Sequence, residues 1–265
     1  MSNNIHPSAI IEEGAIIGEN VKIGAYSIIG HNVKIGDNTI IKPHVVIEGI
    51  TSIGKNNTIF SFAAIGQVPQ DLKYKNEESQ VIIGDNNKIR EYVTIHSGTK
   101  DGGMVTRIGN NCLLMIGTHI AHDCIVGNNV IMANNATLGG HVIIEDNAVI
   151  GGLAAIHQFV RIGKNAMVGG MSGVENDVIP YATVIGERAA LAGLNLVGLK
   201  RKGVDKEQIH CLRGFYKKLF DKKSGNVQDN LASLRDQYQN QALITDIIRF
   251  LQSKTYRAIC TPKLK

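Results

Sequence analysis

An isoleucine recurs at every sixth position from the start of the chain, and this period restricts the fold more than any other feature. Eleven successive anchors follow it without a miss, from Ile5 to Ile65. The series resumes at Ile83 for three anchors and again at Ile108, after which aliphatic residues keep the period up to Val174. A period of six fits neither an isolated α-helix nor a plain alternating strand, and it is typical of a parallel β-helix of hexapeptide repeats.

Each hexapeptide is expected to form one short flat side with its aliphatic anchor pointing inward, so that three sides close a coil of about 18 residues. The corners need left-handed backbone, which asparagine and glycine adopt most easily. Asparagines fall three residues after an anchor at nine predicted corners: Asn20, Asn32, Asn38, Asn56, Asn111, Asn129, Asn135, Asn147 and Asn165. Hexapeptide coils are left-handed, an exception to the usual right-handed crossover. We therefore predict a mainly β fold, with a left-handed parallel β-helix over residues 1–190.

The period breaks near residues 67–80 and 97–106, and both breaks predict loops that project from the coil, where binding groups often lie. After Ile185 the period is lost. Apolar residues then recur at three- and four-residue steps, which predicts amphipathic helices over residues 204–223, 226–239 and 242–253. We expect a small α-helical C-terminal domain over residues 191–265.

Composition sets further limits. The chain has 265 residues with 29 glycines, no tryptophan and only 5% aromatic residues, so its core must be aliphatic. The four cysteines show neither CxxC spacing nor a dense framework, as expected for reduced thiols in a cytosolic protein. The sequence shows neither a secretory leader nor an apolar run of about 18 residues. We expect a cytoplasmic protein without stable membrane insertion, and its net charge of +5 suits an acidic partner.

The stretch IGTHIAHDCIVGN sets His119 and His122 three residues apart with Asp123 beside them, although the repeat itself needs no imidazole. Residues 18 apart stack in neighbouring coils, about 4.8 Å from one another. His122 is therefore expected directly beneath Gly140. His141 lies one position further round on that upper coil.

His157 and Gln158 fall on the next coil up, so His122, His141 and His157 are expected to form one vertical stripe. Taken singly, each of these histidines is readily explained as a surface or turn residue. A zinc site would need three or four ligands in tetrahedral reach, as in the β-helical carbonic anhydrases, but the three-residue spacing does not match their pattern, and we expect no metal.

Acyl transfer to an alcohol is the other chemistry that suits this stripe. A neutral imidazole near its ordinary pKa can take the hydroxyl proton as the oxygen attacks a thioester. Asp123 would support the imidazolium that forms. A backbone N–H that no side chain obstructs, such as that of Gly140, would stabilise the oxyanion.

Several segments together resemble the UDP-N-acetylglucosamine O-acyltransferases, which begin lipid A assembly in Gram-negative bacteria. The segments are QDLKY at 70–74, HIAHDC at 119–124, NNATLGGH at 134–141, IHQF at 156–159, MVGGMSGV at 167–174 and GLNLVGLKRKG at 193–203. The resemblance covers essentially the whole chain. It implies transfer of an (R)-3-hydroxyacyl group from acyl carrier protein to the 3-hydroxyl of UDP-N-acetylglucosamine, with no cofactor beyond the donor's phosphopantetheine arm. A relative that N-acylates the next sugar intermediate carries an additional N-terminal domain and is disfavoured, because the repeats begin at Ile5.

By this resemblance His122 is the general base, Asp123 its dyad partner and Gly140 the oxyanion donor. Other residues match substrate contacts in the family. Those for the sugar and the polar lining of the cleft are Gln70, Asp71, Lys73, His119, His141, His157 and Gln158, and those for the nucleotide and diphosphate are Asn195 and Arg201. Val197 stands where the family often has a glutamate, so a ribose hydrogen bond made there is absent, although Arg201 can still pair with phosphate.

The resemblance also implies a homotrimer with active sites between neighbouring prisms. Gly170 matches the position that limits acyl-chain length, and because glycine leaves room we expect long chains of around fourteen carbons. The segment from Lys200 to Lys223 contains nine Lys or Arg but only three Asp or Glu. This positive surplus suits acidic acyl carrier protein as a partner, rather than nucleic acid. Three alternatives stay open: a coenzyme A-dependent acetyltransferase, a scaffold without catalysis, and an acceptor sugar with a 3-amine.

Overall fold

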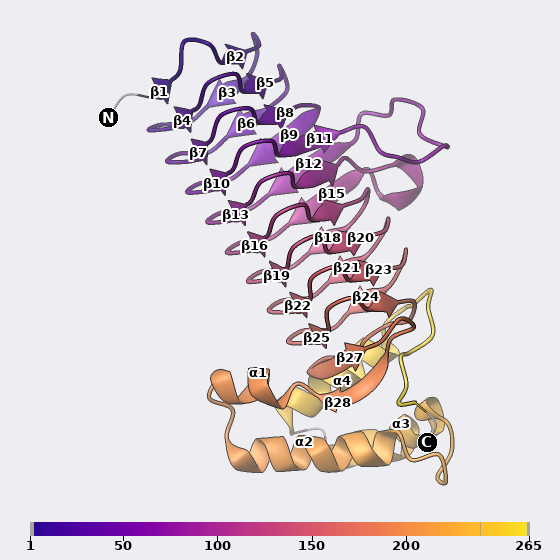
Figure 1. Cartoon of the computed structure of the whole chain (residues 1–265). Coiled ribbons are helices and arrows are strands. Elements are labelled where there is room, and N and C mark those ends of the chain that lie inside the picture. Colours follow the sequence, from indigo (N-terminus) through magenta and orange to yellow (C-terminus); the bar gives the residue numbers. More distant parts are fainter. Residues whose placement is uncertain (1–2, 239, 264–265) are drawn as a thin grey trace.

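Short parallel strands form most of the molecule. The computed structural model describes residues 3–238 and 240–263. The strands stack into three flat sheets that close a left-handed triangular prism, and the N-terminus lies at the end opposite the helices (Figure 1). The predicted left-handed parallel β-helix is confirmed.

Each sheet takes one side from every coil. The first sheet has the order β1 (Asn4–Ile5), β4 (Lys22–Ile23), β7 (Ile40–Ile41), β10 (Thr58–Ile59), β13 (Lys88–Ile89), β16 (Leu113–Leu114), β19 (Ile131–Met132), β22 (Val149–Ile150), β25 (Met167–Val168), β27 (Ala182–Ile185) and β28 (Ala190–Leu194). The second has the order β2 (Ile10–Ile11), β5 (Ile28–Ile29), β8 (Val46–Ile47), β11 (Ala64–Gln67), β14 (Thr94–His96), β17 (His119–Ile120), β20 (Thr137–Leu138), β23 (Ala155–Ile156) and β26 (Gly173–Val174). The third runs, along the chain, through β3 (Ile16–Ile17), β6 (Lys34–Ile35), β9 (Ile50–Ile53), β12 (Gln80–Ile83), β15 (Val105–Ile108), β18 (Ile125–Val126), β21 (Ile143–Ile144) and β24 (Arg161–Ile162).

The aliphatic anchors form the core. From Ile23 to Val174 every predicted anchor is buried, because the first residue of each two-residue strand points outward and the second points into the prism. Burying one such side chain stabilises the fold by about 1.5–3 kcal/mol. Ile5 remains 39% exposed, because it belongs to the first coil and has no coil beneath it.

Left-handed backbone occurs at eight of the nine predicted asparagine corners, and Asn32 is the exception. Larger side chains occupy other corners in the same conformation. Tyr26, His44 and Phe62 have φ of 58°, 61° and 65°. Since a left-handed corner is costly for these residues, the stacking of successive coils must over-determine it.

The two inserted loops leave the stacking undisturbed. Coil partners are normally 18 residues apart, but Ile53 pairs with Ile83 across the first loop and Ile83 with Ile108 across the second. The chain therefore leaves the prism after β11 and returns at β12, and it leaves again between β14 and β15, where η1 (Lys100–Gly102) lies. Both loops project from the same side of the prism (Figure 1).

Helices close the C-terminal end. They are α1 (Leu196–Arg201), α2 (Lys206–Leu219), α3 (Val227–Leu234), η2 (Arg235–Tyr238) and α4 (Ala242–Gln252). The apolar spacing predicted α2, α3 and α4, whereas α1 was not predicted. Its start is fixed locally by Asn195, whose side chain accepts from the N–H of Gly198. Gln239, Leu264 and Lys265 of the predicted helical domain lie outside the described residues.

Candidate active site

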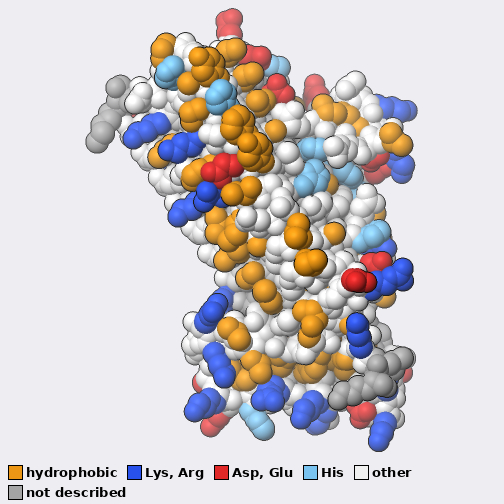
Figure 2. Space-filling model, viewed as in Figure 1, with side chains coloured by type: hydrophobic (Ala, Val, Ile, Leu, Met, Phe, Trp, Pro, Cys, Tyr) orange, Lys and Arg blue, Asp and Glu red, His pale blue; other side chains and the backbone are white. Residues whose placement is uncertain are grey.

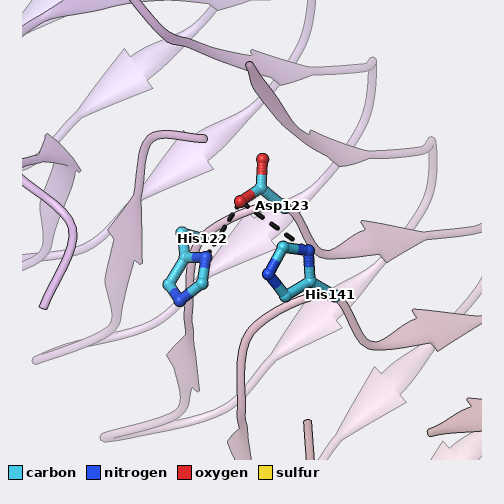
Figure 3. A group of neighbouring side chains, drawn as sticks. All are labelled: His122, Asp123 and His141. Atoms are coloured by element: carbon cyan, nitrogen blue, oxygen red, sulfur yellow. Dashed lines mark hydrogen bonds and ion pairs between the residues drawn. The ribbon is translucent and has the colours of Figure 1, made fainter. Parts of the chain in front are cut away.

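His122 and Asp123 form a buried pair at a corner of the prism. Nδ1 of His122 lies 2.9 Å from Oδ2 of Asp123, and the two residues are 5% and 4% exposed (Figure 3). Asp123 occupies the corner itself, with φ of 59°. An ionised carboxylate only accepts hydrogen bonds, so the shared hydrogen belongs to Nδ1. This leaves Nε2 of His122 as a proton acceptor.

The carboxylate is held in its ionised form. Burial would raise the pKa of Asp123, but hydrogen bonds from His122 and Thr99 outweigh it and lower the pKa below its ordinary value. His141 faces the same oxygen, with Nδ1 3.9 Å from Oδ2 of Asp123 (Figure 3). Burial lowers the pKa of His141 despite the nearby charges of Asp123, Asp71 and Asp101, so this imidazole is neutral at neutral pH.

Gly140 lies against the His122 ring, as the 18-residue stacking predicted. A Cβ at this position would lie 2.4 Å from Cε1 and 2.5 Å from Nε2 of His122. Only glycine therefore fits without moving the imidazole. In the described part of the chain the N–H of Gly140 has no acceptor, so it is free to donate to a bound group.

Two further histidines lie behind the dyad. His119 pairs with Thr94, with Nδ1 and Oγ1 2.7 Å apart. The ring of His96 meets that of His119 edge to face at 4.8 Å. Burial and the neighbouring histidines lower the pKa of His96 to about 4, and burial with the charge of His122 also lowers that of His119. His96 was missed from the sequence because the second loop changes the coil spacing next to it.

The predicted stripe is wrong at its upper end. Phe159, not His157, continues the column, because it follows His141 by 18 residues and stacks on that ring at 4.3 Å. His157 is exposed and turns to the C-terminal segment, where Nδ1 lies 2.6 Å from Nη2 of Arg257. Gln158 is also exposed, and its carbonyl accepts from Nε of Arg257.

The first loop carries the residues that were predicted to contact the sugar. Gln70 and Lys73 are exposed, and Asp71 is half-buried and accepts from the N–H of Lys73 at 2.9 Å. The charge of Asp71 raises the pKa of His141 and so partly offsets the lowering by burial. Histidine side chains gather at the surface beside the loops in Figure 2.

The remaining predicted residues lie at other corners of the same chain. Nδ2 of Asn195 donates to the carbonyl of Asn165, which lies at a different corner of the prism from His122. Arg201 ends α1 and is exposed, as is Val197. Gly170 lies at the third corner, where a Cβ would meet only the backbone of Gly152. One chain therefore does not bring these residues to His122.

His122, Asp123 and His141 also form a group that a metal ion could join. One ligand atom from each lies within 4.8 Å of the others. In the structure Oδ2 of Asp123 accepts a hydrogen bond from Nδ1 of His122 and lies 3.9 Å from Nδ1 of His141 (Figure 3).

Among the described residues, none of the helices has the length and apolar character needed to cross a membrane.

Two family models match this chain. Residues 177–260 match the second domain of UDP-N-acetylglucosamine O-acyltransferase. Residues 14–49 and 106–140 match the bacterial transferase hexapeptide repeat.

Individual relatives extend the likeness to nearly the whole chain. The acyl-(acyl-carrier-protein)–UDP-N-acetylglucosamine O-acyltransferase of Rickettsia canadensis is 52% identical over 262 residues, which cover 98% of each chain. The enzyme of that name from Myxococcus xanthus is 50% identical and covers 94% of this chain and 96% of its own. The structure of UDP-N-acetylglucosamine acyltransferase from Campylobacter jejuni superposes with a TM-score of 0.92 at 43% identity, covering 98% of this chain and 100% of that one. The chain therefore belongs to the UDP-N-acetylglucosamine O-acyltransferase family.

Proposed function

We propose that this protein transfers an (R)-3-hydroxyacyl group from acyl carrier protein to the glucosamine 3-hydroxyl of UDP-N-acetylglucosamine, the first step of lipid A biosynthesis. The observation that carries the proposal is the buried His122–Asp123 pair beneath the free N–H of Gly140. The relatives that share nearly the whole chain carry the name of this reaction.

In the proposed reaction Nε2 of His122 takes the proton of the sugar hydroxyl as its oxygen attacks the thioester carbonyl carbon. The charge that develops on the carbonyl oxygen is stabilised by the N–H of Gly140. Asp123 stabilises the imidazolium through Nδ1. The tetrahedral intermediate then collapses, the carbon–sulfur bond breaks, and His122 returns the proton to the leaving thiolate.

We further propose that the active site is completed by a neighbouring copy in a homotrimer. His122, Asn195 and Gly170 lie at three different corners, so nucleotide and acyl-chain contacts reach the dyad only from another prism. Gln70, Asp71, Lys73, His119, His141, His157 and Gln158 would line the cleft around the sugar, and Arg201 would pair with the diphosphate.

The acyl donor is proposed to be acyl carrier protein, which carries the thioester on phosphopantetheine and makes a further cofactor or metal unnecessary. Lys206, Arg213, Lys217 and Lys218 are exposed along α2. Figure 2 shows Lys and Arg side chains spread over this helical end of the molecule, where an acidic partner would dock. The reaction is proposed to take place in the cytoplasm.

Gly170 is proposed to set the acyl-chain length. Its exposed surface leaves room for a chain of around fourteen carbons. Gly170→Met would fill that room, and we expect the preferred donor to shorten to about ten carbons with the base unaffected. Competition between 3-hydroxyacyl carrier proteins of different lengths measures this, and an unchanged preference would refute the role of Gly170.

The decisive experiment is a mass-spectrometric assay with UDP-N-acetylglucosamine and a series of 3-hydroxyacyl carrier proteins, run beside acetyl-CoA. We expect a UDP-acylsugar only from carrier-protein donors, and a rate about 10²- to 10⁴-fold lower for His122→Ala. Turnover of acetyl-CoA alone would indicate an acetyltransferase. Turnover only with a 3-amino sugar would reassign the acceptor, and near-normal turnover by His122→Ala would refute the base.

A further inference from the structure

The second inserted loop binds the carboxylate of the dyad. The N–H of Thr99 donates to both oxygens of Asp123, at 2.9 Å to Oδ1 and 3.0 Å to Oδ2. The Thr99 hydroxyl donates to Oδ2 at 2.6 Å, and Thr99 is 4% exposed. On the other side, the N–H of Asp123 donates to the hydroxyl of Thr106 at 2.8 Å. The ends of the loop therefore hold both the backbone and the side chain of Asp123.

Two glycines let the loop come this close. A Cβ on Gly102 would lie 1.9 Å from Cγ of Asp123, and a Cβ on Gly98 would lie 2.8 Å from Oδ1. Neither distance is possible for a real side chain, so the backbone of the loop packs directly on the carboxylate. The loop is thus fitted to Asp123 rather than a free extension of the coil.

One oxygen of the carboxylate, Oδ2, accepts hydrogen bonds from both the loop and His122. Oδ2 receives the Thr99 hydroxyl on one side and Nδ1 of His122 on the other. Without the Thr99 hydroxyl, Oδ2 would lose its shortest hydrogen bond, and only the Thr99 N–H, which is shared between both oxygens, would remain from the loop to orient the carboxylate. The hydrogen bond to His122 would then lose the geometry that keeps hydrogen on Nδ1 and leaves Nε2 free.

We propose that Thr99 is a positioning residue for acyl transfer: it orients the Asp123 carboxylate, which in turn fixes the tautomer and orientation of His122. The inference rests on the proposed role of His122 as the base. Thr99 does not touch the reacting atoms, so its loss is expected to lower kcat about 10- to 100-fold while KM for the UDP-sugar stays within about twofold, because only the alignment of the base changes.

Three variants test the proposal. Thr99→Val keeps the branched shape and the backbone N–H but removes the hydroxyl. Thr99→Ser keeps the hydroxyl and is expected to restore kcat to within about threefold of the original enzyme. Thr39→Val is the matched control, because Thr39 is equally buried and its hydroxyl donates to the carbonyl of Gly54 at 3.0 Å, far along the prism from the dyad.

The second readout is the tautomer of His122, measured by nitrogen NMR on protein with isotope-labelled histidine and assigned with His122→Ala. We expect the Nδ1–H form in the original protein, in Thr99→Ser and in Thr39→Val, and a mixture of tautomers in Thr99→Val. A lower kcat with an unchanged tautomer, or an unchanged kcat, would overturn the proposal. Since the spectrum needs no substrate, it decides the positioning of His122 even where every acyl donor fails and the proposed function falls.

Discussion

Two corners of the prism carry histidines in nearly the same conformation but in different surroundings. His44 and His141 have φ of 61° and 62°, and each stacks on an aromatic ring one coil away. His44 lies in an exposed column of rings between Tyr26 and Phe62, at centroid distances of 5.3 and 5.2 Å. His141 instead has Asp123 in the coil beneath it and His122 at its edge, 4.9 Å away.

Coil geometry alone therefore does not make a site. Both columns follow the same stacking register and rest on the same aliphatic core. The corner that holds His122 and Asp123 differs because an inserted loop packs on it and brings hydrogen-bond donors to a carboxylate.

Gly140→Ala should have the largest effect. The added methyl group cannot fit beside the His122 ring, so the imidazole must leave its hydrogen bond with Asp123. We expect turnover to fall about 10³-fold, or about 4 kcal/mol of transition-state stabilisation. Gly30→Ala, in the N-terminal part of the prism far from the dyad, is the control. A Cβ at Gly30 would meet the backbone of Glu48 at 3.4 Å, which is an ordinary contact. Equal losses in the two variants would contradict the contrast.

Ile41→Ala and Ile144→Ala should destabilise the fold equally, because the two corners rest on the same aliphatic core. Both anchors are buried, one beside the exposed ring column and one beside the dyad. Each substitution should reduce the free energy of unfolding by about 3 kcal/mol, through lost burial and a residual cavity. Denaturant unfolding at equal protein concentration measures this free energy. A difference above about 2 kcal/mol between the two variants would mean that the core is stabilised differently beneath the two corners.

His96→Gln should change the acid sensitivity of the fold, and His44→Gln should not. The pKa of His96 is about 4 in the folded chain, below the unfolded value of about 6.5, because the imidazole is buried. Its contribution to stability is complete above pH 6.5 and is lost as the pH falls towards 4, amounting to about 2 kcal/mol between pH 7 and pH 5.

Unfolding curves at these two pH values are the measurement, with exposed His44 as the matched position. The loss between pH 7 and pH 5 should shrink by about 2 kcal/mol in His96→Gln alone. The same pH dependence in all three proteins would show that His96 is not buried in its neutral form.

Regular stacking explains what could be predicted from the sequence. The period of six identifies the buried anchors, and the 18-residue coil alone predicts that Gly140 lies over His122. The placement of Gly140 depends on the uninterrupted repeats between residues 108 and 174, where coil partners keep this spacing.

Prediction failed where the spacing changes or where distant segments meet. Thr94 pairs with His119 rather than with a residue 18 positions away. The position of His96 next to His119 therefore could not be predicted without knowing how many residues the second loop adds to the coil. Thr99 lies inside that loop, and no periodicity aligns it with Asp123. His157 was misplaced because it falls two residues short of the 18-residue register of His141, which Phe159 keeps; His157 instead contacts Arg257, a hundred residues later in the chain.

The two insertions have a consequence for how this architecture accepts change. A chain that leaves the prism and re-enters one rung higher adds nothing to the core, whatever the length of the excursion, since Ile53, Ile83 and Ile108 still stack in one line. Closing a flexible loop twice as long costs only about 0.6 kcal/mol. Except at Gly98, Thr99 and Gly102, which pack on Asp123, the loops around the dyad can therefore change in length and composition while every anchor keeps its partner, so that the selectivity and the stability of this molecule vary almost independently.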